Sequence, residues 1–205
     1  DGEEWYFMKG ILFVLSGPSG TGKGTVCDEP IKRGCGVSLS VSMTTRECRE
    51  GETPGVTYHY VTKDEFKRNI ENGEMLEYAQ YGENYYGTPR SSVEEKLSEG
   101  MDVLLEIEPQ GALQVKRKFP EAVLVFLVPP SMHELKRRLI TRGREGEDEI
   151  DKRIETARWE LTQAEKYNVH IVNDTLDECV DRVIEYFDEK RAERKKIEEL
   201  INEKV

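Results

Sequence analysis

The chain has few cysteines and no long apolar run. Its four cysteines among 205 residues form neither a CxxC pair nor a Cys/His metal spacing, so they predict reduced thiols and no structural metal. The apolar stretch at residues 11–15 runs directly into glycine-rich sequence and is too short to cross a bilayer or to act as a secretion signal. These absences argue against secreted and membrane-spanning classes and favour a cytoplasmic protein.

Positive charge is also in deficit. The sequence carries 41 acidic and 30 basic residues, a formal net charge of −11, so its surface would repel the phosphates of nucleic acid. An anionic ligand must therefore be bound by a local group of cations. Two groups stand out, Arg46 with Arg49 and the basic run from Lys136 to Arg153.

Short apolar runs of strand length recur along the chain, with helical stretches between the later ones. They cover residues 11–15, 103–107, 123–128 and 169–172. Continuous apolar strands are buried on both faces, which predicts a mostly parallel sheet covered by helices. A chain of this length has room for one such α/β domain with smaller insertions.

Helix starts are visible as hydroxyl residues followed three positions later by glutamate. Thr62, Ser131 and Thr175 fit this capping box, in which the two side chains satisfy exposed amides of the first turn. Pro30 falls inside the helix expected after the first strand, where its missing N–H predicts a kink or an early end.

Residues 44–89 differ in amino-acid composition from the rest of the chain. They are polar, rich in tyrosine and punctuated by glycine, which predicts a subdomain inserted into a core made of residues 9–43 and 90–205. Residues 1–8 are interpreted as a leader or a cloning remnant.

A second polar segment, residues 142–149, contains no apolar residue and is expected at the surface. We interpret it as part of a lid at about residues 142–153. An ordinary surface loop is the alternative. The charged C-terminal tail predicts a solvated helix.

The sequence GPSGTGKGT has the context of a phosphate-binding loop, because it follows a strand and precedes a helix. Its glycines allow backbone amides to turn toward phosphate oxygens, and Lys23 would neutralise the β- and γ-phosphates of ATP. Gly24 stands where serine or threonine usually binds Mg²⁺, so the metal is expected on Thr25 or, mostly, on phosphates and water. The predicted ATP-binding residues of this loop are Gly17, Pro18, Ser19, Gly20, Thr21, Gly22, Lys23, Gly24 and Thr25.

From about residue 10 to residue 180 the chain resembles guanylate kinases of bacterial type. The ordered matches are GPSGTGK, SMTTRECREGE, VTYHYV, LEYAQYGENYYGTP, LLEIEPQGA, VPPS, RLITRG and HIVND. The resemblance implies an α/β fold, the three-layer P-loop NTPase core, with a GMP-binding subdomain and a lid that close over ATP and GMP. It implies Mg²⁺-dependent transfer of the γ-phosphate to GMP or dGMP, and neither nucleic acid nor a membrane as partner.

The resemblance also implies a GMP site. Arginine forks match phosphate oxygens, tyrosine hydroxyls add donors, and a carboxylate can accept from the guanine N1–H and amino group together. An alternative for Tyr58 and Tyr86 is that they are core aromatics, whereas Tyr60, Tyr78 and Tyr85 are assigned to packing. The implied GMP-binding residues are Ser42, Arg46, Arg49, Tyr58, Glu77, Tyr86, Gly87, Thr88 and Glu108.

For the transfer step, the resemblance places Arg138, Arg142 and Arg153 with Lys23 as catalytic residues on the transferring phosphates, and Asn173 beside the adenine. Phosphoryl transfer requires neutralised charge and in-line positioning, and the GMP phosphate already carries an anionic nucleophile. No general base is therefore expected.

Two places in the site depart from the family's pattern. Glu47 and Cys48 replace a small residue and a proline between the two arginines, and Glu108 replaces an aspartate, so its carboxylate reaches about one methylene further. One alternative is a kinase-dead guanylate kinase-like module that binds phosphorylated peptides, and another is an enzyme with a different acceptor. The retained Lys23 argues against the first, and Glu77 argues against the second.

Overall fold

The core of the computed structural model, which describes residues 10–141 and 147–203, is a five-stranded sheet. Its strand order is β2-β7-β1-β8-β9, and all four neighbouring pairs are parallel. The strands are β1 (Leu12–Ser16), β2 (Val37–Leu39), β7 (Asp102–Glu106), β8 (Val123–Val128) and β9 (Val169–Val172). The four strands expected from apolar runs are confirmed, with ends that differ by at most one residue. The strand β2 was not predicted, because its three residues do not form an apolar run.

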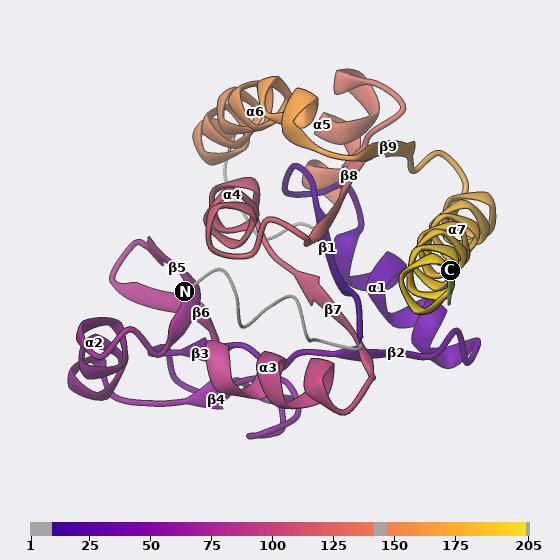
Figure 1. Cartoon of the computed structure of the whole chain (residues 1–205). Coiled ribbons are helices and arrows are strands. Elements are labelled where there is room, and N and C mark those ends of the chain that lie inside the picture. Colours follow the sequence, from indigo (N-terminus) through magenta and orange to yellow (C-terminus); the bar gives the residue numbers. More distant parts are fainter. Residues whose placement is uncertain (1–9, 142–146, 204–205) are drawn as a thin grey trace.

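Helices cover both faces of this sheet, so the three-layer architecture is confirmed (Figure 1). Alternation along β1 shows why: Leu12 and Val14 pack on one side of the sheet, Phe13 and Leu15 on the other. The first side is covered by α3 (Arg90–Ser98) and α4 (Pro109–Lys118), the second by α1 (Lys23–Lys32) and α7 (Leu176–Asn202). Phe13 stacks on Phe187 of α7 with ring centroids 4.0 Å apart.

A second sheet lies beside the core and is built from residues between β2 and α3 (Figure 1). Its strand order is β4-β3-β6-β5. It contains β3 (Met43–Thr44), β4 (His59–Tyr60), β5 (Met75–Tyr81) and β6 (Asn84–Pro89), with α2 (Lys63–Glu71) between β4 and β5. The antiparallel register sets Glu77 opposite Thr88, next to a bulge that follows Met75.

Two more helices, α5 (Met132–Thr141) and α6 (Glu147–Thr162), pack against each other beyond β8 and are followed by the short 3-10 helix η2 (Ala164–Lys166). Part of the predicted lid, residues 142–146 including Arg142, lies outside the described residues. The rest of that prediction, from residue 147, belongs to α6.

The predicted helix starts are confirmed in two cases. The hydroxyls of Thr62 and Ser131 accept hydrogen bonds from the amides of Glu65 and Glu134, at 3.2 and 3.1 Å. The third prediction was wrong in its chemistry. Thr175 precedes α7, but its side chain makes no capping hydrogen bond, and the turn closes instead through its carbonyl oxygen to the Cys179 amide.

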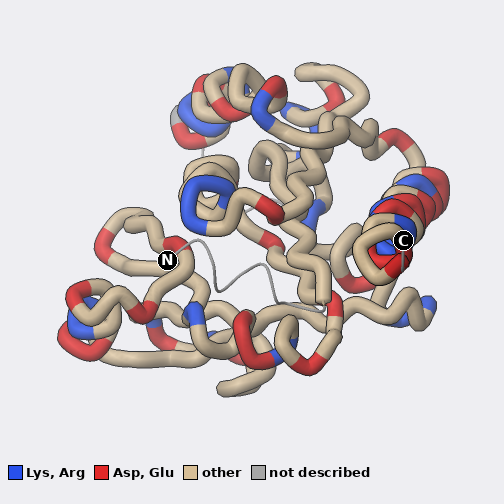
Figure 2. The backbone as a smooth tube through the Cα atoms, viewed as in Figure 1, with Lys and Arg blue, Asp and Glu red and all other residues tan. Residues whose placement is uncertain are grey.

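The early helix end expected from Pro30 is confirmed, because α1 stops two residues later, at Lys32. Most charged residues lie on the helices, and α7 is especially dense in them, while the central strands carry few (Figure 2). Within the described part of the chain, no helix combines the length and the apolar character needed to cross a membrane.

Candidate functional site

The phosphate-binding loop connects β1 to α1 and is closed by a local turn. Both the amide and the hydroxyl of Thr21 donate to the Pro18 carbonyl, at 3.2 and 2.7 Å. Gly20 and Gly22 have left-handed backbone conformations, with φ of 91° and 89°. A Cβ at residue 22 would lie 2.8 Å from the amide nitrogen of Asn173, so only glycine fits this close approach.

Lys23 is buried at the start of α1, with 8% of its surface exposed. Its ammonium donates to the carbonyl of Gly17 at 2.7 Å and to the carbonyl of Pro18 at 3.3 Å. It also lies 3.1 Å from the carboxylate of Glu108. The lysine is therefore held in the loop by oxygen atoms, in the position from which it can reach a phosphate.

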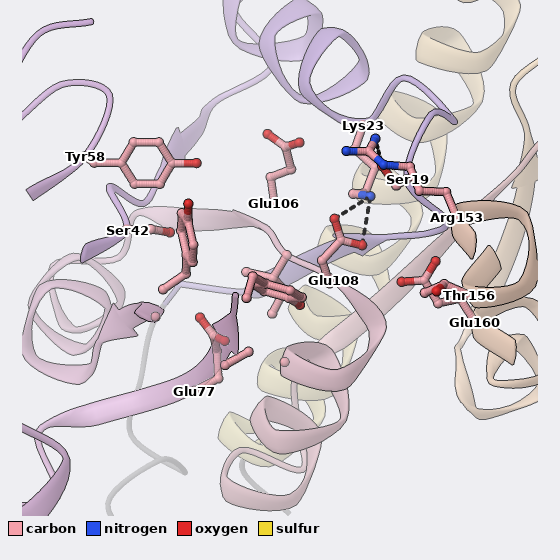
Figure 3. A pocket seen from close by; sticks show the side chains of 16 residues that line it. Ser19, Lys23, Ser42, Tyr58, Glu77, Glu106, Glu108, Arg153, Thr156 and Glu160 are labelled. Atoms are coloured by element: carbon pink, nitrogen blue, oxygen red, sulfur yellow. Dashed lines mark hydrogen bonds and ion pairs between the residues drawn. The ribbon is translucent and has the colours of Figure 1, made fainter. Parts of the chain in front are cut away.

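A cleft of about 470 Å³ extends from this loop to the second sheet. In Figure 3, Tyr58 and Glu77 lie on one side, Lys23, Ser19 and Arg153 on the other, with Glu106 and Glu108 between them. The cleft therefore brings together two groups of residues that are far apart in sequence. Of the residues expected from the sequence, it is lined by Ser19, Lys23, Ser42, Tyr58, Glu77, Tyr86, Gly87, Glu108 and Arg153.

Glu77 forms one end of the cleft. It is 4% exposed, and its carboxylate accepts a 2.7 Å hydrogen bond from the hydroxyl of Thr88, also buried. Gly111 of α4 makes room for it, because a Cβ there would lie 2.6 Å from a Glu77 carboxylate oxygen. Burial raises the pKa of Glu77 to about 7, which makes its ionisation costly until a ligand donates to it.

The other end of the second sheet holds Arg46 rigidly. Its guanidinium lies over the rings of Tyr58 and Tyr60, 5.1 and 5.8 Å from their centroids. Two of its nitrogens also donate to Glu52, at 2.7 and 2.5 Å. The hydrogen bonds from Arg46 are the first cause that lowers the pKa of Glu52, to about 2. An arginine fixed in this way is oriented for an anion before the anion arrives.

Tyr58 and Tyr86 are half-buried and line the cleft, with their rings edge to face at 6.1 Å. Neither belongs to the hydrophobic core, so the alternative that they are core aromatics is wrong. Tyr60, assigned to packing, does more than pack, because its hydroxyl donates to Glu52 at 2.7 Å. Arg49 is exposed and does not line the cleft, although its amide donates to Glu52 at 2.8 Å.

Glu108 lies away from the position expected of a residue that shares base recognition with Glu77. In the structure its carboxylate is paired with Lys23, at the phosphate-binding loop. As the residue that precedes α4, it enters the cleft between the two sides.

Glu160 is a cleft residue that the sequence interpretation missed. It is 6% exposed, lies on α6 and lines the same cleft as Ser19 and Glu108. Burial first, and then the negative charge of Glu108, raise the pKa of Glu160 to about 7. The spacing of α6 could have indicated this residue. Glu160 follows buried Ala157 by three positions and so lies on the buried face of the helix, where a glutamate is unexpected.

A second hollow of about 380 Å³ lies on the other side of the loop. It is lined by Thr25, Arg138 and Asn173, and the Asn173 amide donates to the Thr21 carbonyl at 2.6 Å. Arg138 is hydrogen-bonded to Glu134 at 2.8 Å. The structure thus separates Arg138 from Arg153, whose guanidinium lies 3.4 Å from the Ser19 hydroxyl in the main cleft.

A phosphate-binding loop that faces an Arg/Tyr/Glu pocket across one cleft defines a P-loop kinase fold with sites for two ligands. The family model for guanylate kinase matches residues 9–190. The chain belongs to the guanylate kinase family.

Individual relatives agree with this assignment. A guanylate kinase of Oceanobacillus iheyensis is 50% identical over 189 residues, which cover 92% of both chains. One of Thermus thermophilus is 52% identical over 173 residues, covering 84% of this chain and 78% of that one. The crystal structure of guanylate kinase from Anaplasma phagocytophilum superposes with a TM-score of 0.73 at 34% identity, covering 89% of this chain and 87% of that chain.

Proposed function

We propose that this protein transfers the terminal phosphate of ATP to GMP or dGMP, giving ADP and GDP or dGDP. The observation that carries the proposal is the cleft in which the P-loop lysine faces the buried carboxylate of Glu77, with Arg46 fixed against the ring of the lining residue Tyr58. The family assignment supports the same reaction, since the guanylate kinases of Oceanobacillus iheyensis and Thermus thermophilus align with most of this chain.

On the ATP side, the loop amides and Lys23 bind the β- and γ-phosphates, and the dipole of α1 adds positive potential at its first turn. Arg153 is placed beside Ser19 to neutralise charge on the transferring group. Asn173 and Arg138 line the outer hollow, where the rest of the nucleotide would lie. Arg142 is proposed as a further phosphate contact from the resemblance alone.

On the GMP side, Tyr58 and Tyr86 of the cleft bind the acceptor phosphate with Arg46, whose guanidinium lies over the Tyr58 ring. Ser42 lines the same cleft, and Arg49 is a second cation on the loop outside it. Because the acceptor phosphate is itself the nucleophile, these residues need only hold it in line with the γ-phosphate.

Guanine is read at the buried end of the cleft. Glu77 accepts from N1–H and the exocyclic amino group, while Thr88 orients the carboxylate by its hydrogen bond. Adenine has no N1–H and would leave this buried carboxylate without its donors. Gly87, next to Thr88 in β6, lets the backbone approach the base closely, and Glu108 would join the base only after leaving Lys23.

The residues present fit a Mg²⁺ ion that arrives with ATP. Within the described residues, no cluster of three or more His, Cys, Asp or Glu side chains could hold a metal ion. Thr25 offers a hydroxyl beside the loop, and Mg²⁺ commonly keeps phosphate and water oxygens as most of its ligands. When bound, the ion would neutralise charge on the β- and γ-phosphates.

The test is formation of ADP from ATP and Mg²⁺ with a panel of GMP, dGMP, AMP, UMP and CMP. We expect GMP and dGMP to be the best acceptors. A preference for another monophosphate would contradict the assignment of Glu77. No ADP with any acceptor would favour the peptide-binding alternative.

Closure around both substrates is part of the same proposal, with residues 44–89 and the helix α6 approaching each other to exclude water from the transfer site. Small-angle scattering with and without a bisubstrate analogue would measure it. We expect a smaller radius of gyration in the complex, and an unchanged radius would contradict closure.

A further inference from the structure

The helix α4 contacts the strand β5 at the outer edge of the second sheet (Figure 1). Among the described residues, β5 is the last strand of that sheet, so β6 pairs with one row of its backbone groups and the other row faces outward. An open edge of this kind leaves amides and carbonyls in need of partners. Here side chains of α4 supply the partners.

Gln114 binds the outward-facing groups of Tyr78. Its side-chain nitrogen donates to the Tyr78 carbonyl at 2.8 Å, and its side-chain oxygen accepts from the Tyr78 amide at 3.2 Å. A glutamine amide carries a donor and an acceptor in one plane, as a peptide group does, so it can bind a strand residue as a neighbouring strand would. One turn further along α4, the ammonium of Lys118 donates to the Met75 carbonyl at 2.8 Å.

These two attachments lie on either side of Glu77. The register of β5 is irregular between Met75 and Glu77, where a bulge interrupts the pairing with β6. Gly111 precedes Gln114 by three residues, on the same face of α4, and leaves the space that the Glu77 carboxylate occupies. The helix therefore fixes the backbone before and after Glu77 and also bounds its side chain.

We infer that Gln114 is a positioning residue for guanine recognition, which holds the Glu77 carboxylate in place by fixing the Tyr78 backbone against α4. The inference rests on the proposed function and extends it to a residue outside the set that lines the cleft. The helix α4 begins directly after Glu108, which is paired with Lys23. One helix thus connects the phosphate-binding loop to the base site and sets the distance between them.

The effect of Gln114 is specific for the acceptor base. Without its two hydrogen bonds the edge of β5 can move away from α4, and the Glu77 carboxylate moves with it. A displacement of about 1 Å in a group that contacts the substrate is enough to weaken catalysis severalfold to a hundredfold. The loop that binds ATP is built from other residues. A residue that only stabilised the fold would instead lower activity with every substrate to the same extent.

The test is Gln114→Met, which nearly keeps the length of the side chain and removes both hydrogen bonds. We expect the KM for GMP to rise about threefold to tenfold, while the KM for MgATP and kcat/KM for AMP change less than twofold. An unchanged KM for GMP, or an equal loss with every substrate, would overturn the inference.

Gln80→Met is the matched control. Gln80 is an exposed glutamine on the same strand, and it donates to the Gly82 carbonyl at 3.0 Å within its own hairpin. The substitution is therefore the same, but the lost hydrogen bond does not join β5 to α4. The control should keep the KM for GMP of the unchanged protein, and a rise equal to that of Gln114→Met would contradict a specific role for the contact with α4.

A double-mutant cycle tests whether Gln114 acts through Glu77. In Glu77→Gln the contact with guanine is already weakened, so the position of this side chain matters less. Addition of Gln114→Met to this variant should change kcat/KM for GMP less than twofold, because the two effects are coupled. Fully additive effects would show that Gln114 acts independently of Glu77 and would overturn the inference.

A binding measurement separates this inference from the proposed reaction. Calorimetric titration with GMP alone gives its Kd without turnover. We expect Gln114→Met to raise this Kd about threefold to tenfold and Gln80→Met to leave it unchanged. That result without phosphorylation of GMP would contradict only the proposed function. Phosphorylation of GMP with an unchanged Kd in Gln114→Met would contradict only the inference.

If Gln114→Met fails to fold, Gln114→Glu provides the second variant. An ionised carboxylate can still accept from the Tyr78 amide but cannot donate to the Tyr78 carbonyl, so one of the two attachments remains. We expect the KM for GMP to rise at least threefold with the KM for MgATP unchanged. A KM for GMP equal to that of the unchanged protein would overturn the inference.

Discussion

The two sides of the cleft are constructed in different ways. The ATP side is one loop of nine consecutive residues, in which backbone carbonyls hold Lys23 and a turn at Thr21 closes the loop. The GMP side takes single side chains from β5, from β6 and from the segments that flank β3 and β4. Sheet register joins some of them, as in the pairing of Glu77 with Thr88. The first side depends on local backbone geometry, and the second on long-range packing.

This difference decides where each side is vulnerable. A change on the ATP side should abolish transfer with any acceptor, because charge neutralisation is common to all of them. A change on the GMP side should alter the choice of acceptor. The following variants test that division.

The largest effect is expected for Lys23→Ala. Removal of the ammonium leaves the β- and γ-phosphates unneutralised, so turnover should fall by about a hundredfold or more with every acceptor. Initial rates of ADP formation measure it. Lys32→Ala, an exposed lysine at the end of the same helix, is the control and should be unaffected. Near-normal turnover in Lys23→Ala would contradict the assignment of the loop.

Glu77→Gln should change acceptor choice. Glutamine replaces one acceptor oxygen by a donor that faces the N–H groups of guanine, and charge-assisted hydrogen bonds contribute roughly 1.5–3 kcal/mol. We expect kcat/KM for GMP to fall about tenfold to a hundredfold, while that for AMP changes little. Glu74→Gln, exposed in the same region, is the control. An unchanged ratio of the two efficiencies would mean that guanine is selected elsewhere.

The companion test is Glu108, whose carboxylate is paired with Lys23. If Glu108 also joins the base when GMP is bound, Glu108→Asp should retain substantial GMP activity and Glu108→Ala should lose it. The same assay measures both variants. Equal GMP activity of Glu108→Asp and Glu108→Ala would mean that Glu108 takes no part in base recognition.

Gly111→Ala tests the packing behind Glu77 without touching a polar group. The added Cβ would lie 2.6 Å from the Glu77 carboxylate and must displace it. A shift of about 1 Å is enough to reduce kcat/KM for GMP roughly threefold to tenfold. Stability should not fall, since alanine is favoured over glycine in helices by about 1 kcal/mol. Gln110→Ala is the exposed control on α4, and a parallel loss of stability would indicate general disruption.

The smallest effect concerns stability and pH. The pKa of Glu77 is raised to about 7, well above the value of an unfolded glutamate, so the folded protein holds this proton more tightly. Stability contributed by the protonated form is therefore lost as pH rises from about 4.5 through 7. Urea unfolding at pH 5 and pH 8 should show Glu77→Gln gaining about 1–2 kcal/mol relative to the unchanged protein at the higher pH. If the unfolding free energies of the variant and the unchanged protein differed by the same amount at pH 5 and pH 8, titration of Glu77 would not be the cause.

Much of the fold could be predicted from the sequence because the signals are local. The apolar runs identified four core strands, and β2 escaped because three residues, one of them a serine, are too few to form a run. The loop was predicted from its glycines and lysine, since backbone amides need only the correct turn. The capping residues Thr62 and Ser131 were likewise predicted from four-residue patterns.

The site was predicted less completely because its contacts depend on distant segments. Resemblance predicted base contacts for Glu77, Thr88 and Glu108. In the structure Glu77 lines the cleft and Thr88 donates to it, whereas Glu108 is paired with Lys23. The resemblance also gave no role to Glu52, which fixes Arg46, or to Glu160, which is buried in the cleft. In a chain with 41 acidic residues, composition cannot distinguish these glutamates from solvated ones.

The sequence by itself therefore determined the class of fold, the phosphate-binding loop and the list of side chains able to contact two nucleotides. Periodicity and turn chemistry operate over a few residues, and both are readable without a structure. Only the tertiary structure decided which carboxylate meets which cation. Glu108 and Glu160 come together with Lys23 because α4, α6 and α1 converge on one cleft, and that convergence is set by packing on the central sheet rather than by any local pattern.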